Sequence, residues 1–201
     1  LIAMFTTEPG HIQSREPVRS LADISGMKLR AAGTGVAVLD KLGAAPVGMP
    51  MPEVPQSIQT RVIDGVLTSR EVLKDFRLAE SLKYVTDYPS VVVTFAAVMD
   101  RKRWDALPAD VQKVIDELAE EMPTWTGNFH DNENVGAAMK WAQEEQKLEV
   151  VSLNDGEKAA WDAKLAPLVD SWVADMSAKG LPAEKYVQRA RELRDQFAAK
   201  K

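Results

Sequence analysis

The sequence of 201 residues contains no cysteine and only two histidines, His11 and His130. The lack of cysteine excludes a disulfide framework, a thiol nucleophile and every metal site that uses thiolates. It does not fix the compartment, because a chain without thiols is indifferent to redox state. The two histidines lie far apart and no HExxH spacing is present. We therefore expect neither a metal site nor a cofactor.

Long apolar runs and dense basic runs are also missing. The most apolar stretch, residues 91–99, is far shorter than the ~18 residues that a membrane-spanning helix requires. The formal net charge is −5, and no Lys/Arg cluster offers a surface for nucleic acid or anionic lipid. No GxSxG or P-loop motif is found. The remaining composition, with 45% hydrophobic and 27% charged residues, is that of an ordinary globular protein.

The first half of the chain alternates between strand and helix patterns. Strands are expected at 1–5, 27–31, 46–49, from 66, at 83–86 and at 91–99, and helices after Ser20, at 36–42, after Pro52 or Pro55, and at 70–76. We interpret 1–5 as a buried strand and 91–99, apolar on both faces, as a central strand. Repeated strand–helix–strand units predict an α/β fold with a mostly parallel sheet that is covered by helices.

The second half of the chain is predominantly helical. Pro108 begins a helix with an apolar face, residues 125–146 form a longer polar helix, and a short strand follows at 149–153. Trp161 and Trp172 belong to an apolar stripe with a kink at Pro167, and we expect both to dock the tail helices onto the body. We accordingly divide the chain into an α/β domain, 1–99, and a helical region, 100–201.

Arg30 and the Gly33-Thr34-Gly35 turn form the candidate binding site. Arg30 ends a strand and the turn leads into a helix, and ligands of open α/β sheets bind at the carboxyl ends of strands. A helix N-terminus favours an anion, and an arginine fork can hold a carboxylate with two parallel bonds. This pattern favours a small carboxylate, although an arginine at a strand end is usually a solvated charge.

A nucleotide-dependent α/β enzyme is the alternative for the same loop. Gly33 and Gly35 match the first two glycines of the dinucleotide fingerprint GxGxxG. The third position is Val38, where a small residue normally lets helix and strand pack closely. The fingerprint is therefore incomplete, and a purely structural domain without a ligand remains the third reading.

Four ordered segments resemble the solute-binding proteins of TRAP (tripartite ATP-independent periplasmic) transporters, of the DctP type. Residues 23–30, DISGMKLR, resemble the family signature DLKGxKIR, and 42–50, LGAAPVGMP, resemble its LGAxPvxMp. Residues 57–65, SIQTRVIDG, and 104–112, WDALPADVQ, resemble two later signatures in the same order. Together these segments cover almost the whole chain, and the resemblance is far more specific than any one motif.

The resemblance implies a type II periplasmic-binding-protein-like fold and names further site residues. It implies that Arg30 forms a salt bridge with the ligand carboxylate and that Gly33 and Thr34 line the site. Met51 stands where relatives often have an aromatic residue on the ligand, and Thr68 where many have asparagine. These two departures favour a monocarboxylate or partly apolar acid over sugar acids and simple dicarboxylates. Arg70 is a candidate for a second positive contact, with a surface role as its alternative.

The resemblance also implies a two-lobed receptor, without enzymatic activity, that works in the periplasm. It would deliver a small organic acid to the membrane subunits of the transporter. The chain corresponds to the second lobe, the crossing strands and the tail helices, so we expect it to be the later part of something longer. Without a first lobe we expect exposed apolar area, weak ligand binding and a tendency to self-associate.

Overall fold

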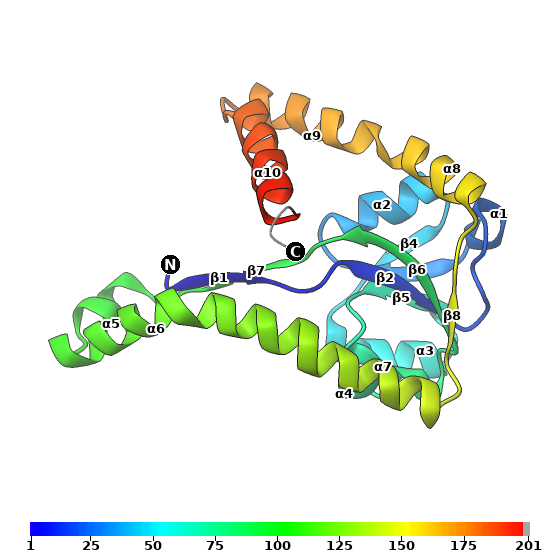
Figure 1. The fold of residues 1–201 in the computed structure, drawn as a ribbon, viewed down its shortest axis with the longest axis horizontal. Helices are drawn as coiled ribbons and strands as arrows, with labels where there is room; N and C mark the ends of the chain where they lie inside the picture. The colour runs from blue at the N-terminus through cyan, green and yellow to red at the C-terminus, as the bar shows by residue number, and fades with distance from the viewer. Residues whose placement is uncertain (199–201) are drawn as a thin grey trace.

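The computed structural model describes residues 1–198 and contains two β-sheets (Figure 1). The larger sheet has the order β4-β3-β5-β2-β6-β8 and comprises β2 (Gly10–Ser14), β3 (Lys28–Ala31), β4 (Ala45–Gly48), β5 (Gly65–Thr68), β6 (Tyr84–Val91) and β8 (Glu149–Val151). Strands β4, β3 and β5 are parallel, as are β6 and β8, while β2 runs antiparallel between β5 and β6. The predicted α/β class with a mostly parallel sheet is confirmed.

Helices cover both faces of this sheet. The first face packs on α1 (Leu21–Ile24), α2 (Gly35–Leu42) and α8 (Asp155–Leu165), around a core that includes Leu29, Leu39 and the fully buried Trp161. The second face packs on α3 (Val54–Gln59), α4 (Val72–Asp75) and α7 (Val135–Glu144), with the short helices η1 (Met51–Glu53) and η2 (Leu78–Glu80) beside them. The predicted helical region 100–201 thus contributes a strand and two covering helices to the sheet of residues 1–99.

The local sequence signals are found where they were predicted. The Ser20 hydroxyl accepts a hydrogen bond from the Asp23 backbone N–H at 3.2 Å and begins α1. The Asn154 side chain accepts one from the Glu157 N–H at 2.9 Å and begins α8. Such caps satisfy N–H groups that the first helical turn leaves free. Gly43 ends α2, as expected.

The expectation of two apolar strands in the core is wrong. β1 (Ala3–Thr6) and β7 (Thr94–Ala97) pair only with each other, and every residue of β7 is exposed. Their ribbon extends away from the six-stranded sheet beside α6 (Ala109–Asn128) (Figure 1). An apolar run therefore does not by itself show that a strand lies in the core of the sheet.

The long helix and the tail helices are more exposed than their apolar stripes predict. α5 (Arg101–Asp105) and α6 carry the Val111–Leu118 stripe, but the side chains of Val114 and Leu118 are about half exposed. α6 continues through the π-helical turn η3 (Phe129–Asn134) into α7, so one unbroken helix replaces the two predicted. α9 (Pro167–Ala178) and α10 (Ala183–Ala198) form an outer pair, and Trp172 lies exposed on α9, whereas Trp161 docks α8 as predicted. Among residues 1–198, no helix combines the length and hydropathy needed to span a bilayer.

Candidate functional site

The candidate site lies at the edge of the sheet where the three parallel strands end. β3 ends at Ala31, β4 at Gly48 and β5 at Thr68, so the loops that follow them leave the sheet on the same side. Because β2 is antiparallel, its first residues reach this edge as well. The edge therefore brings together residues from four segments of the chain, the ends of β3, β4 and β5 and the start of β2.

Arg30 is the buried cation of this edge. Its side chain is only 7% exposed, and its Nε donates a hydrogen bond to the Met49 carbonyl oxygen at 3.0 Å, which fixes the guanidinium after the end of β4. No carboxylate within residues 1–198 forms an ion pair with it, and burial lowers its pKa. A buried charge without a counterion is costly, and an anionic ligand would remove that cost.

The strand register places several polar side chains on the same face as Arg30. Arg30 lies opposite Val66 on β5, and Val66 lies opposite Gln13 on β2. One step nearer the edge, Thr68 lies opposite His11. Directly paired residues and residues two apart share a face. Arg30, Gln13, Thr68 and His11 therefore all point toward the α3–α4 side of the sheet.

Glu8 and Arg70 form a buried ion pair next to this row. Arg70 Nε and Nη2 donate to the two oxygens of Glu8 at 2.9 and 2.6 Å, and the Arg70 backbone N–H donates to the same carboxylate at 2.7 Å. Burial alone would raise the pKa of Glu8, but the hydrogen bonds from Arg70 outweigh it and hold that pKa below its ordinary value. The same carboxylate raises the pKa of Arg70. Both groups therefore stay charged and neutralise each other.

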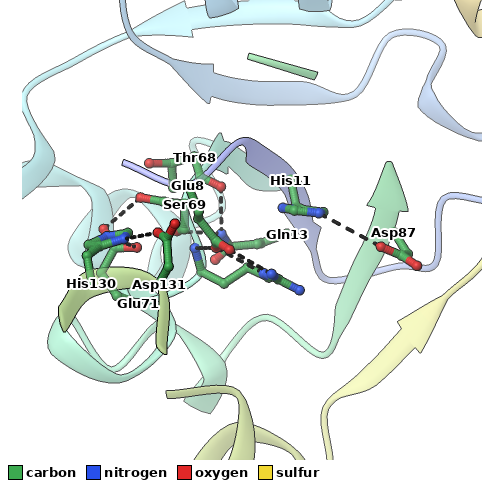
Figure 2. A network of polar contacts seen from close by, with 10 residues as sticks. Glu8, His11, Gln13, Thr68, Ser69, Glu71, Asp87, His130 and Asp131 are labelled. Carbon is green, nitrogen blue, oxygen red and sulfur yellow. Dashed lines mark hydrogen bonds and ion pairs between the residues drawn. The ribbon is translucent and has the colours of Figure 1, made fainter. Parts of the chain in front are cut away.

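His11 and Gln13 extend the network behind the ion pair (Figure 2). His11 is 4% exposed, and its Nε2 lies 3.8 Å from an Asp87 carboxylate oxygen. Burial, followed by the positive charge of Arg70, lowers the pKa of His11. Gln13 is fully buried, and its side-chain amide donates to the carbonyl oxygens of Thr68 and Ser69 at 3.1 and 2.9 Å. Gln13 thus anchors the loop that follows β5.

A second contact ties this loop to the long helix. The Ser69 hydroxyl donates to Glu71 Oε1 at 2.7 Å, and Glu71 Oε2 lies 3.3 Å from His130 Nε2 (Figure 2). His130 belongs to η3, and its Nδ1 lies 3.1 Å from Asp131. The side chains of Glu71 and His130 are each 15% exposed. Glu71 and His130 therefore form a polar link between the loop after β5 and the long helix.

The remaining predicted site residues lie at the same edge but not in one cluster. Gly33 adopts φ +53° and Thr34 begins α2, and both are exposed. The Gly35 and Val36 N–H groups already donate to Ala32 and Gly33, which leaves fewer donors at this helix end than the sequence suggests. Thr34 lines an apolar groove toward α9, on the opposite side of the sheet from Arg30.

Met51 and Thr68 are positioned by their backbones. Met51 begins η1 after β4 and is half-buried against the core between the sheet and α3. Thr68 is the last residue of β5, and its carbonyl oxygen is held by Gln13. Met51 therefore follows β4, and Thr68 ends β5, and both of these strands are adjacent to β3. The roles of these residues and of Arg70 toward a ligand remain predictions.

Glu8, His11, Gln13 and Asp87 are residues that sequence reasoning missed. They come from the start of β2, the residues before it, and β6. β2 contains one large apolar residue, Ile12, so its hydrophobic pattern does not reveal a buried strand. Polar residues alternate with it on the functional face, and that alternation was the available signal. Within residues 1–198 no cluster of three or more metal-ligating side chains is present.

An α/β lobe whose buried arginine has no acidic partner in residues 1–198, at the carboxyl ends of parallel strands, is suited to bind an anionic solute. The family model of bacterial extracellular solute-binding protein family 7, DctP, matches residues 6–175, and the chain belongs to this family. This confirms the resemblance seen in the sequence. The family consists of periplasmic receptors and not of enzymes, which agrees with the prediction and argues against the nucleotide-dependent alternative.

Relatives and solved structures share the architecture over nearly the whole chain. The C4-dicarboxylate-binding periplasmic protein DctP of Rhodobacter capsulatus is 27% identical over 176 residues, which are 87% of this chain and 53% of that protein. A TRAP solute-binding protein of Rhodoferax ferrireducens with copurified benzoate is 25% identical, with a TM-score of 0.90, over 98% of this chain and 63% of that one. One from a marine metagenome, in complex with metahydroxyphenylacetate, is 29% identical, with a TM-score of 0.90, over 98% and 64%. The chain thus spans about half the length of the curated relatives it matches.

Proposed function

We propose that the chain is the lobe of a TRAP solute-binding protein that binds a small organic monocarboxylate through Arg30 and delivers it to the membrane subunits of the transporter. The observation that carries the proposal is the buried guanidinium of Arg30, which has no acidic partner in the described chain. Its Nε is committed to Met49, so its two Nη groups are available for both oxygens of one carboxylate. Each charge-assisted bond contributes about 1.5–3 kcal/mol.

Aromatic monocarboxylates are the ligand class that best fits the surroundings. The half-buried Met51 offers an adaptable apolar contact after β4, next to the Met49 carbonyl that holds Arg30. Two structural neighbours with TM-scores of 0.90 are described with benzoate and with metahydroxyphenylacetate, both of which carry a single carboxylate on an aromatic ring. Because Arg70 is neutralised by Glu8, the edge offers one unmatched buried cation and not two.

Thermal unfolding in the presence of benzoate tests the proposal. A ligand at 100 times its dissociation constant adds about 2.7 kcal/mol of stability. For a domain of this size we expect a rise in Tm of about 5–10 °C. Arg30→Met keeps much of the buried volume and removes the charge, and we expect it to abolish the shift.

Arg61→Met is the matched control, because Arg61 is exposed in the turn before β5 and lies at the other end of the strands. We expect this variant to keep the full shift. An equal shift in Arg30→Met and wild type would contradict the proposed role of Arg30. No shift with benzoate and a series of other monocarboxylates would contradict the receptor function of this lobe.

We further propose that the exposed face of α6 and the β1–β7 ribbon packs against another lobe. Ile2, Phe5, Ile115 and Met122 line an apolar groove between the ribbon and α6. Apolar surface of this kind on a water-soluble receptor marks an interface. The matched segments make up only 53% and 52% of these two relatives, which leaves room in such a protein for a partner lobe.

A further inference from the structure

We propose that Glu8 determines ligand charge at this site: by neutralising Arg70, it restricts the edge to monoanions and disfavours dicarboxylates. The inference rests on the proposed function and deepens it, since it assigns a specificity role to a residue that contacts an arginine and not the ligand. Glu8 lies in the segment between β1 and β2, outside all four family-like segments of the sequence.

The two arginines occupy neighbouring positions along one edge. Arg30 is on β3 and Arg70 follows the end of β5, the adjacent parallel strand. Glu8 precedes β2, the next strand along, and reaches back to Arg70. Neighbouring strands are about 4.8 Å apart, so β3, which carries Arg30, and β2, which follows Glu8 in the chain, are about 10 Å apart. At this range an unmatched Arg70 would act on the same bound anion as Arg30.

The contacts between Glu8 and Arg70 are suited to offset the charge of the arginine. Three donors of Arg70 converge on the one carboxylate of Glu8, whose side chain is 7% exposed, whereas the side chain of Arg70 is 26% exposed. The buried member is therefore the acid, and the arginine faces the open side of the edge. Of the other nearby carboxylates, Glu71 faces His130, and Asp87 is 56% exposed beside His11. The charge of Asp87 also raises the pKa of Arg70, but less than the hydrogen bond and the charge of Glu8 do. Glu8 is therefore the main group that offsets the charge of Arg70.

If the charge of Glu8 is removed, the site should therefore bind a ligand that carries a second carboxylate. With Glu8→Gln, the site gains one unmatched positive charge while the side chain keeps its size and an acceptor for Arg70. We expect the ratio of the dissociation constants for terephthalate and benzoate, measured by calorimetry, to fall at least tenfold. Benzoate itself should still bind, because Arg30 is unchanged.

Two further variants make the result specific to the pair. Arg70→Gln leaves Glu8 as an unmatched negative charge, and we expect weaker benzoate binding and an even higher terephthalate-to-benzoate ratio. The double variant Glu8→Gln/Arg70→Gln removes both charges, and we expect the ratio to return to within about threefold of wild type, since the pair no longer contributes net charge.

Asp64→Asn is the control for net charge. Asp64 accepts a hydrogen bond from the Lys28 N–H at 2.8 Å at the opposite end of the strands, and its variant should leave the ratio unchanged. If Glu8→Gln binds benzoate but keeps the wild-type ratio, the inference is overturned. If Glu8→Gln does not fold, unequal ratios for the double variant and wild type overturn it. If the wild-type chain binds neither acid, the proposed function fails and the inference fails with it.

Discussion

Most of the buried polar side chains lie beside the edge of the sheet at which the parallel strands end. Glu8, His11, Gln13, Arg30 and Ser69 are all less than a tenth exposed. Buried polar groups are costly unless they are paired. Arg30 donates a hydrogen bond to the Met49 carbonyl oxygen but has no acidic partner among residues 1–198, and it is the arginine that the family resemblance assigns to the ligand. Stability and binding are therefore set by the same small group of residues.

His11 makes the stability of the lobe sensitive to mild acid. Burial and Arg70 hold its pKa below the ordinary value of 6.5, so the folded chain keeps His11 neutral while the unfolded chain takes up a proton. The folded state loses stability as the pH falls below about 6.5. We expect the urea midpoint of wild type to fall between pH 7.5 and pH 5.5. The fall should be smaller in His11→Gln, and equal falls would contradict this assignment.

Arg30 could be predicted from the sequence, whereas its polar neighbours could not. Arg30 ends an alternating segment and is followed by a glycine turn, and both signals are local. Glu8 and Arg70 are separated by 62 residues, and their pairing depends on β2 lying between β5 and β6. A local sequence pattern does not indicate which strands become neighbours. Glu8 could therefore not be recognised as the counterion of Arg70 before the strand order was known.

At the scale of secondary-structure elements, the insertion of β2 depends on Gly65. A Cβ atom on Gly65 would lie 2.2 Å from the Gln13 carbonyl oxygen, which belongs to the backbone of β2 and has no room to move. Gly65 therefore allows β5 to approach β2 closely. This approach holds Gln13 where its side chain can anchor the loop after β5.

Gly65→Ala should consequently destabilise the lobe. We expect a loss of about 3 kcal/mol in the free energy of unfolding, because overpacking against backbone forces the two strands apart. Gly48→Ala is the matched control in the edge strand β4, where an added Cβ meets nothing within 4 Å. Urea denaturation of both variants checks the expectation. A Gly65→Ala variant as stable as Gly48→Ala would show that β2 and β5 are not packed as described.

The elements that could be predicted are those whose signals are complete within a few residues. The caps at Ser20 and Asn154, the strand expected at 27–31 and the helix that ends at Gly43 all agree with the structure. β7 was misplaced because its apolar residues lie exposed on the ribbon with β1 and not within the six-stranded sheet. Two helices were expected over residues 109–144, whereas the structure has one continuous helix that contains Pro123.

At the scale of the whole molecule, one side of α6 and the β1–β7 ribbon remains uncovered. Val111, Val114, Leu118 and Trp125 lie on one face of α6 and are each at least 39% exposed. Together with the apolar groove beside β1, this face is large enough to associate with other apolar surface. This exposed apolar area is the physical reason to expect that the chain self-associates.

We expect this chain alone to form oligomers that depend on concentration through the α6 face. Leu118→Lys should lower the weight-average mass in analytical ultracentrifugation, since a charge on the interface must be desolvated. Glu120→Lys on the opposite side of the helix controls for charge and should leave the mass unchanged. A monomer at all concentrations that binds benzoate tightly would contradict the proposed need for a covering lobe.

The ribbon and the buried ion pair meet at one place in the chain. β1 leads into Glu8 and then into β2, while β6 leads through Val93, whose carbonyl oxygen accepts a hydrogen bond from the Thr7 N–H at 3.1 Å, into β7. This bond joins the two strands at the base of the ribbon, one residue before Glu8, and Figure 1 shows the ribbon extending away from the larger sheet. The backbone that carries Glu8 is therefore held from both sides, by β2 and by the pairing at the base of the ribbon.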